Sequence, residues 1–190
     1  MPEGPEIETE RLHETIHEPP TGTLLRNIAL STALLAALGA VSSLRAGGTV
    51  NEALILKTEA ARLQSEASDQ WAYYQAKGIK ANVEEAAKTS WLAAGKTPPP
   101  ELDATVKRYG DEQKEISAAA KEKEKERDAK STEADELMER HHRFANAVAF
   151  IQISIALGAV AALGRNRLVW YGSMAVGLAG AVLFGLTSLH

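Results

Sequence analysis

The chain alternates between long uncharged apolar stretches and one long charged stretch. Three apolar runs cover residues 28–44, 144–163 and 168–189, and none of them contains Asp, Glu, Lys, Arg or His. A bilayer core about 30 Å thick is crossed by roughly 20 helical residues. Each run is therefore long enough to cross a membrane, and the pattern predicts three transmembrane helices.

A charged segment separates the first two apolar runs. Residues 45–143 hold 17 of the 21 Lys and Arg residues and 19 of the 25 Asp and Glu residues. Charged groups are costly inside a bilayer, so this segment is expected to lie in water. One glycine and three prolines between Gly95 and Pro100 should stop a helix and turn the chain. The flanking segments, 49–94 and 98–143, have equal lengths, which indicates an antiparallel hairpin.

The expected fold is an all-α membrane protein. Three transmembrane helices are joined by a long antiparallel helical hairpin, a coiled-coil-like stalk, between the first and the second. Thr49 and Glu52 fit a capping box, so a new helix is expected to start after Gly47 and Gly48. The acidic residues before the first run differ from the short basic start of a signal peptide, which favours a retained helix. The expected parts are an acidic flexible tail (1–23), transmembrane helix 1 (24–45), a water-exposed hairpin (46–143) with its turn at 95–100, and transmembrane helices 2 (144–163) and 3 (168–189).

An aromatic cluster lies on the outgoing arm of the hairpin. If the arms mirror each other about residue 97, Trp71 lies near residues 123–124 and Tyr74 near residues 120–121. Those positions belong to or adjoin a run of alternating Lys and Glu, and lysine stems can cover an aromatic ring. One such contact leaves part of Trp71, Tyr73 and Tyr74 uncovered. The cluster either packs within the hairpin or is a candidate interface with a neighbouring chain.

Small residues recur every four positions in the apolar runs. In the last run they are Ser173, Gly177, Ala181 and Gly185, and similar stripes occur in the other two. Small residues let helices approach closely in lipid, so Gly177, Ala181 and Gly185 are candidate interface residues, within one chain or between copies. Gln152 is one of few strongly polar groups in the runs and is a candidate pore-lining position. The lack of ionisable groups argues against a pump or an ion-coupled carrier.

The N-terminal segment contains a metalloprotease-like motif in the wrong context. His13-Glu14-Thr15-Ile16-His17 matches H-E-x-x-H, in which two His residues bind zinc and the Glu acts as a base. The motif lies in a short acidic segment followed at once by Pro19-Pro20, with no cleft-forming domain around it. His13 and His17 therefore remain minor candidates for metal binding, and no metal site is expected.

Composition narrows the function further. The net charge of −4 offers no basic field for nucleic acid. The chain has no cysteine, which excludes thiol chemistry and iron–sulfur clusters. No phosphate-binding loop, catalytic triad or paired-carboxylate cleft is recognisable, so we expect neither an enzyme nor a cofactor.

Three stretches resemble one family. The segment from Asp69 to Asn82, DQWAYYQAKGIKAN, is similar to the signature of a bacterial membrane family known as domain of unknown function 4337. Residues 29–36 and 51–54 resemble it too, as does the order of the parts over essentially the whole chain. The resemblance implies a bacterial origin and a location as an integral protein of the inner (cell) membrane. It implies no activity and no catalytic residues.

The expected function is a non-enzymatic integral membrane protein that self-associates in a structural, scaffold or interaction role. Its partners would be membrane lipid and further copies of the chain; a small-molecule ligand is left open. The alternative is an oligomeric pore or transport subunit. A metal-binding tail or metalloprotease comes third.

Overall fold

A computed structural model describes residues 22–189. It contains three helices and, within these residues, no strand: α2 (Thr23–Ala93), α3 (Pro100–Leu163) and α4 (Arg167–Leu189). The residues form two compact units. The hairpin unit is Thr49–Glu139, and the apolar unit combines residues 22–48 with residues 140–189. The expected all-α fold with a long helical hairpin is confirmed.

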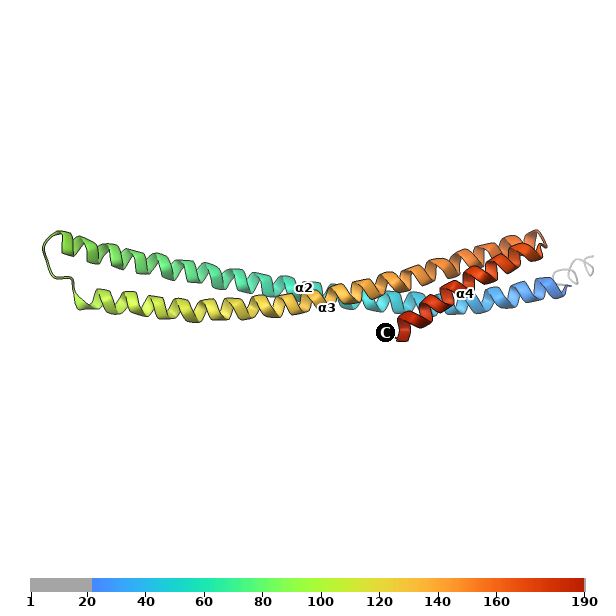
Figure 1. Cartoon of the computed structure of the whole chain (residues 1–190), viewed down its shortest axis with the longest axis horizontal. Helices are drawn as coiled ribbons and strands as arrows, with labels where there is room; N and C mark the ends of the chain where they lie inside the picture. The colour runs from blue at the N-terminus through green and yellow to red at the C-terminus, as the bar shows by residue number, and fades with distance from the viewer. Residues whose placement is uncertain (1–21, 190) are drawn as a thin grey trace, which may run out of the picture. The chain divides into compact units, whose positions relative to one another are not determined.

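The hairpin unit is built from the second part of α2 and the first part of α3, which run antiparallel (Figure 1). Small and aliphatic residues at three- and four-residue spacing form its seam, as helical periodicity requires. The buried members are Ala53, Ala60, Leu63 and Ala67 on α2, and Ile116, Ala120 and Ala134 on α3. Because most are alanines, the two backbones can lie close together.

The turn at the tip of the hairpin follows from Gly95. This glycine has φ +68°, its N–H donates to Leu92 O (3.0 Å), and the N–H of Lys96 donates to Trp91 O (3.0 Å). This pair of hydrogen bonds is a Schellman motif, which satisfies carbonyls that a helix end leaves free. Pro100 then begins α3, where its missing N–H costs nothing.

The register of the hairpin differs from the expected one. Lys77 pairs with Glu112 and Lys88 with Asp103, both at 2.6 Å, so facing residues are mirrored about residue 95 and not 97. The end of α2 therefore extends past the beginning of α3. Residues 96–99 are not helical, and an extended residue spans about 3.3 Å against 1.5 Å in a helix. The four extended residues can therefore run back alongside the last turn of α2 before α3 begins. The expectation of two arms of equal length did not include this.

The predicted helix start at Thr49 is wrong. α2 passes through Gly47 and Gly48 without interruption and continues to Ala93. Each of the two glycines makes the helix less stable by about 1 kcal/mol relative to alanine. The residue before them, however, is held by contacts within the fold. Ala46 is buried, and its carbonyl lies 2.9 Å from Nδ1 of His141. Packing on α3 therefore outweighs the local preference for a break.

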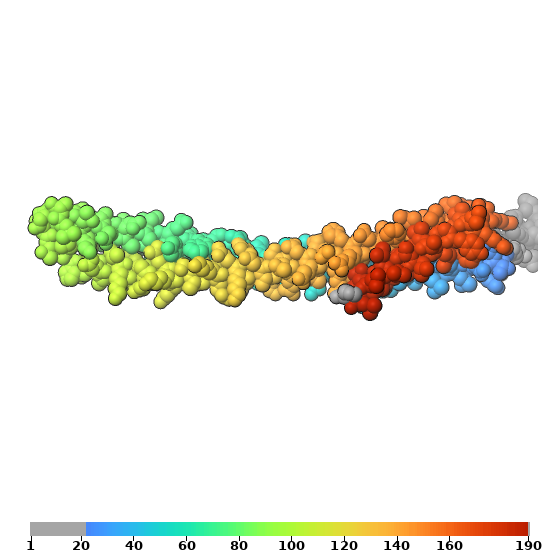
Figure 2. All heavy atoms as spheres, viewed as in Figure 1, coloured from blue at the N-terminus to red at the C-terminus, as the bar shows by residue number. Residues whose placement is uncertain are grey.

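The apolar unit contains the N-terminal part of α2, the C-terminal part of α3 and all of α4. Within it, α4 lies along α3 (Figure 2). Each helix has an 18-residue window with mean hydropathy of 1.7, 1.9 and 1.7 in chain order, so all three are long and apolar enough to cross a membrane. Burial within the chain is low: 6% of the window in α2, 28% in α3 and 22% in α4. Most of this apolar surface therefore faces outward.

The link between α3 and α4 is a compact turn at Arg165 and Asn166. Arg165 has φ +46°, and the N–H of Asn166 donates to Ala161 O at 3.1 Å, which closes α3. The Asn166 side chain then caps α4, since its Oδ1 accepts from the N–H of Leu168 at 2.9 Å. Asparagine is a favoured residue at a helix N-terminus for this reason.

Candidate functional site

The Trp71 side chain makes its contacts within the hairpin. Its indole N–H donates to Glu124 Oε1 at 2.9 Å, which confirms the expected approach to residues 123–124. Its ring meets Tyr74 edge to face, with centroids 5.5 Å apart and planes at 76°. Tyr74 was expected near residues 120–121, but its backbone lies closer to Gln113. The Nε2 of Gln113 donates to the backbone carbonyl O of Tyr74 at 3.2 Å. Trp71 and Tyr74 are half-buried by these contacts.

Several ion pairs join α2 to α3 across the hairpin. Among their side chains, that of Lys77 is the least exposed to solvent. Its ammonium lies 2.6 Å from Glu112 Oε2 and about equally far from two tyrosine rings, 5.1 Å from Tyr73 and 5.3 Å from Tyr109. Its side chain is 14% exposed. Hydrogen bonding to Glu112, and then to Tyr73, raises the pKa of Lys77. The same bond lowers the pKa of Glu112, so both groups stay charged at neutral pH.

Tyr73 has a different environment from the other two aromatic residues. Its side chain is 51% exposed although Lys77 lies over its ring. Of the three aromatic candidates for an interface, Tyr73 therefore has the most surface available outside the hairpin, while Trp71 and Tyr74 contribute to holding α2 against α3.

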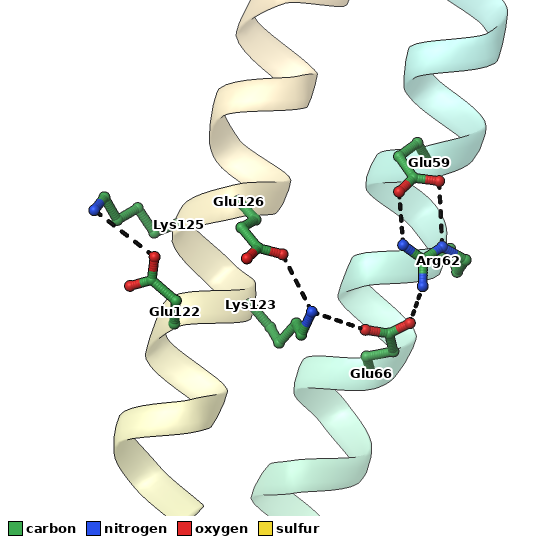
Figure 3. Close-up of polar contacts among 7 residues, drawn as sticks. All are labelled: Glu59, Arg62, Glu66, Glu122, Lys123, Lys125 and Glu126. Atoms are coloured by element: carbon green, nitrogen blue, oxygen red, sulfur yellow. Dashed lines mark hydrogen bonds and ion pairs between the residues drawn. The ribbon is translucent and has the colours of Figure 1, made fainter.

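A charged network joins residues 59–66 of α2 to residues 123–126 of α3 (Figure 3). Lys123 Nζ on α3 lies 3.2 Å from Glu126 and 3.3 Å from Glu66 on α2. Arg62 pairs with both Glu66 and Glu59. These side chains are substantially exposed, so solvent screening leaves each pair a small contribution to stability. Of these pairs, Lys123–Glu66 is the one that joins α2 to α3.

Two serines join α3 and α4 inside the apolar unit. Ser154 Oγ donates to Ser173 O at 2.6 Å, and Ser173 Oγ donates to Ser154 O at 2.8 Å. The helix α2 also packs closely here, because Gly158 has no side chain. A Cβ on Gly158 would lie 2.8 Å from Thr32 Oγ1 on α2. This serine–glycine junction satisfies its polar groups internally, as an apolar environment requires.

The small-residue stripes lie partly where the sequence indicated. Gly177 is buried against Ser154 and Leu35, whereas Ala181 and Gly185 are only partly covered. The buried positions of α4 are Ser173, Gly177, Gly180 and Thr187. Gly180 was missed because its spacing from Gly177 is three and not four; a helical face follows a period of 3.6.

The alanine stripe of the first apolar run, in α2, is exposed. Ala29, Ala33 and Ala37 are exposed, and two of them line an open groove of about 390 Å³ between α2 and α3. The groove, which we call the alanine groove, is lined by Ile28, Ala29, Thr32, Ala33, Ala36, Gly158, Ala159 and Ala162. Gln152, the candidate pore residue, is also exposed on the apolar unit.

The H-E-x-x-H motif at His13 and His17 lies outside the described residues. Among residues 22–189 there is no group of three His, Asp or Glu side chains placed to hold a metal ion.

The comparisons with known proteins give one family. The model of a family described as domain of unknown function (DUF4337) matches residues 24–190. No curated protein and no solved structure matches the chain.

Proposed function

The chain belongs to the family of domain of unknown function 4337, and we propose that it is a non-enzymatic integral membrane protein that self-associates and carries its helical hairpin in water. The proposal assigns it a structural or interaction role. Membrane lipid and other copies of the chain are its partners.

Membrane insertion is supported by the outward apolar surface of all three helices. Leu34 is 73% exposed, Leu163 89% and Leu168 79%. Apolar surface costs about 25 cal/mol per Å² in water, and soluble monomers rarely expose large contiguous apolar patches. A bilayer removes this cost without any partner protein. The helical spans fit a bacterial inner membrane, since proteins of the bacterial outer membrane typically span it as β-barrels.

The observation that carries self-association is the alanine groove. Its lining is small or apolar throughout, and one chain leaves it open. In lipid, hydrophobic burial does not drive helices together, and close packing along small residues does. A helix from a second copy can approach this groove closely, whereas bulky lipid-facing residues such as Leu34 would hold it away.

Filling the groove tests the proposal. We expect Ala33→Leu to dissociate the assembly, because the larger side chain occupies the space that a second helix would use. The measurement is the mass of the protein in mild detergent by size-exclusion chromatography with light scattering. Ala179→Leu is the matched control, since Ala179 is an exposed alanine on α4 outside the groove lining. A wild-type monomer in both detergent and lipid would refute self-association.

A pore or transport subunit is the alternative, and exposed Gln152 favours it. An amide facing hydrocarbon is unfavourable, whereas several copies arranged around an axis could line an aqueous path with this side chain. The test is ion flux through liposomes containing the protein. Flux that Gln152→Leu reduces would favour the pore. Flux equal to that of empty liposomes would exclude a constitutively open ion pore.

A further inference from the structure

The outer face of α2 carries a second apolar seam, turned away from α3. Its positions are alternately four and three residues apart, which is the spacing of a heptad seam. They are Ala72, Ala76, Ile79, Val83, Ala86, Ser90 and Ala93, and all are exposed. Ile79 is 64% exposed and Val83 62%. We call these seven residues the outer seam.

The outer seam is unusual because the hairpin otherwise presents charge to water. The outward positions of α3 are rich in Lys and Glu, such as Lys114, Glu115, Lys121 and Glu122. Five charged residues of α2 lie in this stretch, and none of them belongs to the outer seam. Lys77, Glu84 and Lys88 lie on the side of the inner seam, where two of them pair with α3. Lys80 and Glu85 are exposed outside the seven seam positions. A helix that meets only water normally carries its charges on its outer face, so a covered outer seam explains this arrangement.

We propose that the outer seam packs in parallel against the same seam of a second copy, forming a coiled coil between two hairpins. This inference rests on the proposed function, in which copies share one membrane and one orientation. All hairpins then point to the same side, and only a parallel pairing places equal residues at equal height. Ile79 meets the partner's Ile79, and Val83 meets the partner's Val83.

The residues beside the seam suit this pairing. On one side they are Gln75, Asn82 and Thr89, and on the other Tyr73, Lys80 and Ala87. In a parallel heptad pair, each residue of the first set faces one of the second set five positions later. Gln75 therefore faces the partner's Lys80, and no like charges meet. Half-exposed Tyr73 would be covered at the edge of the seam.

Charge also sets where the pairing ends. Continuing the heptad toward the apolar unit brings Asp69 and then Arg62 into the seam. In a parallel pair each would face its own kind, which is destabilising. The outer seam therefore covers about three heptads, a length at which sustained apolar heptads indicate a coiled coil. Its first three residues, Ala72, Ala76 and Ile79, lie within the stretch from Asp69 to Asn82 that resembles the family signature.

Cysteine crosslinking in the membrane tests both the partner and the direction. The natural chain has no cysteine, so single variants Ala76→Cys and Ala86→Cys can be oxidised in full-length protein. Each should form a homodimer of twice the 20.4 kDa chain mass, because a disulfide needs Cα atoms within about 7 Å. Glu115→Cys on the outer face of α3 is the control and should stay monomeric.

The outcomes separate this inference from the proposed function. Ala76→Cys combined with Val83→Lys should lose the crosslink, since equal charges would face each other, while sizing in detergent still shows an assembly held by the alanine groove. An assembly in which neither single cysteine forms a homodimer overturns the outer seam and leaves self-association standing. Crosslinking only between Ala76→Cys and Ala86→Cys chains would show antiparallel pairing and contradict the parallel arrangement. Crosslinking to a different protein would also overturn it.

Discussion

At the scale of single residues, the apolar unit depends on glycines that cannot be enlarged. A Cβ on Gly177 would lie 2.7 Å from Ser154 Oγ and 2.9 Å from both methyl carbons of Leu35. Real side chains do not tolerate these distances, and the Ser154 hydroxyl cannot rotate away without losing its bond to Ser173. The serine pair and the glycine therefore depend on each other.

We expect Gly177→Ala to destabilise the protein by about 1–3 kcal/mol, the range for overpacking a close contact. Thermal unfolding in detergent measures it. Gly172→Ala in the same helix is the control, because no described atom lies within 4 Å of its Cβ. Alanine favours a helix over glycine by about 1 kcal/mol, so the control should be neutral or stabilising. Equal effects of the two substitutions would argue against close packing at Gly177.

The Lys77–Glu112 pair makes the hairpin sensitive to pH at both ends of the scale. The pKa of Glu112 is lowered by its bond to Lys77, so its contribution is present at neutral pH and is lost as the pH falls through the folded-state value. The pKa of Lys77 is raised by the same bond, so its contribution is lost as the pH rises through its folded-state value.

Glu112→Gln should therefore reduce the loss of stability between neutral pH and about pH 3, a range that includes the ordinary pKa of Glu. The thermal midpoint by circular dichroism, measured at several pH values, reports this. Glu115→Gln, at an exposed position on the same helix, should leave the wild-type pH profile unchanged. A profile of Glu112→Gln that parallels the wild type would show that the pair does not contribute to acid sensitivity.

At the scale of the elements, the decisive feature is that α2 does not stop between its apolar and charged parts. Gly47 and Gly48 are helical, and no described atom lies within 4 Å of a Cβ at either position. Nothing prevents alanine there, whereas a glycine with positive φ at a helix end would resist replacement.

The double substitution Gly47→Ala and Gly48→Ala should raise stability by up to about 1 kcal/mol per site. Helicity by circular dichroism should stay the same or rise. Gly95→Ala is the contrasting variant, since φ +68° at the hairpin tip strains any side chain, and it should destabilise. Loss of stability in the double variant would instead support a break in the chain after Gly48.

At the scale of the whole molecule, three crossings of a bilayer would place the chain's landmarks on defined sides. An odd number of crossings separates Thr23 from Leu189, and the hairpin tip near Ser90 lies between the first and second crossing. The hairpin and the end of α4 then share one side, while Thr23 and Asn166 share the other.

Single cysteines in the cysteine-free chain test this topology. With a membrane-impermeant maleimide, Thr97→Cys at the exposed hairpin tip and Ser188→Cys should label from the same side of sealed vesicles. Thr23→Cys should label only from the other side. Labelling of Thr23→Cys and Thr97→Cys from one side would mean that the apolar part of α2 does not cross the membrane.

Much of this architecture can be read from the chain alone. Three uncharged runs specify three apolar helices, because length and hydrophobicity decide whether a segment can cross a bilayer. Gly95 and the prolines that follow specify the turn, because their backbones cannot continue a helix. The approach of Trp71 to Glu124 agrees with the expected mirror about residue 97, although the ion pairs of the hairpin place its register about residue 95.

Only the tertiary structure decided how the helices use these residues. The register about residue 95 depends on ion pairs such as Lys77–Glu112 and on a connection that reaches back along α2. The continuity of α2 through Gly47 depends on packing at Ala46, which outweighs a local capping signal. The choice of Gly180 over Ala181 as a buried position depends on where α3 lies. Such features arise from contacts between segments far apart in sequence, and local propensity carries no information about them.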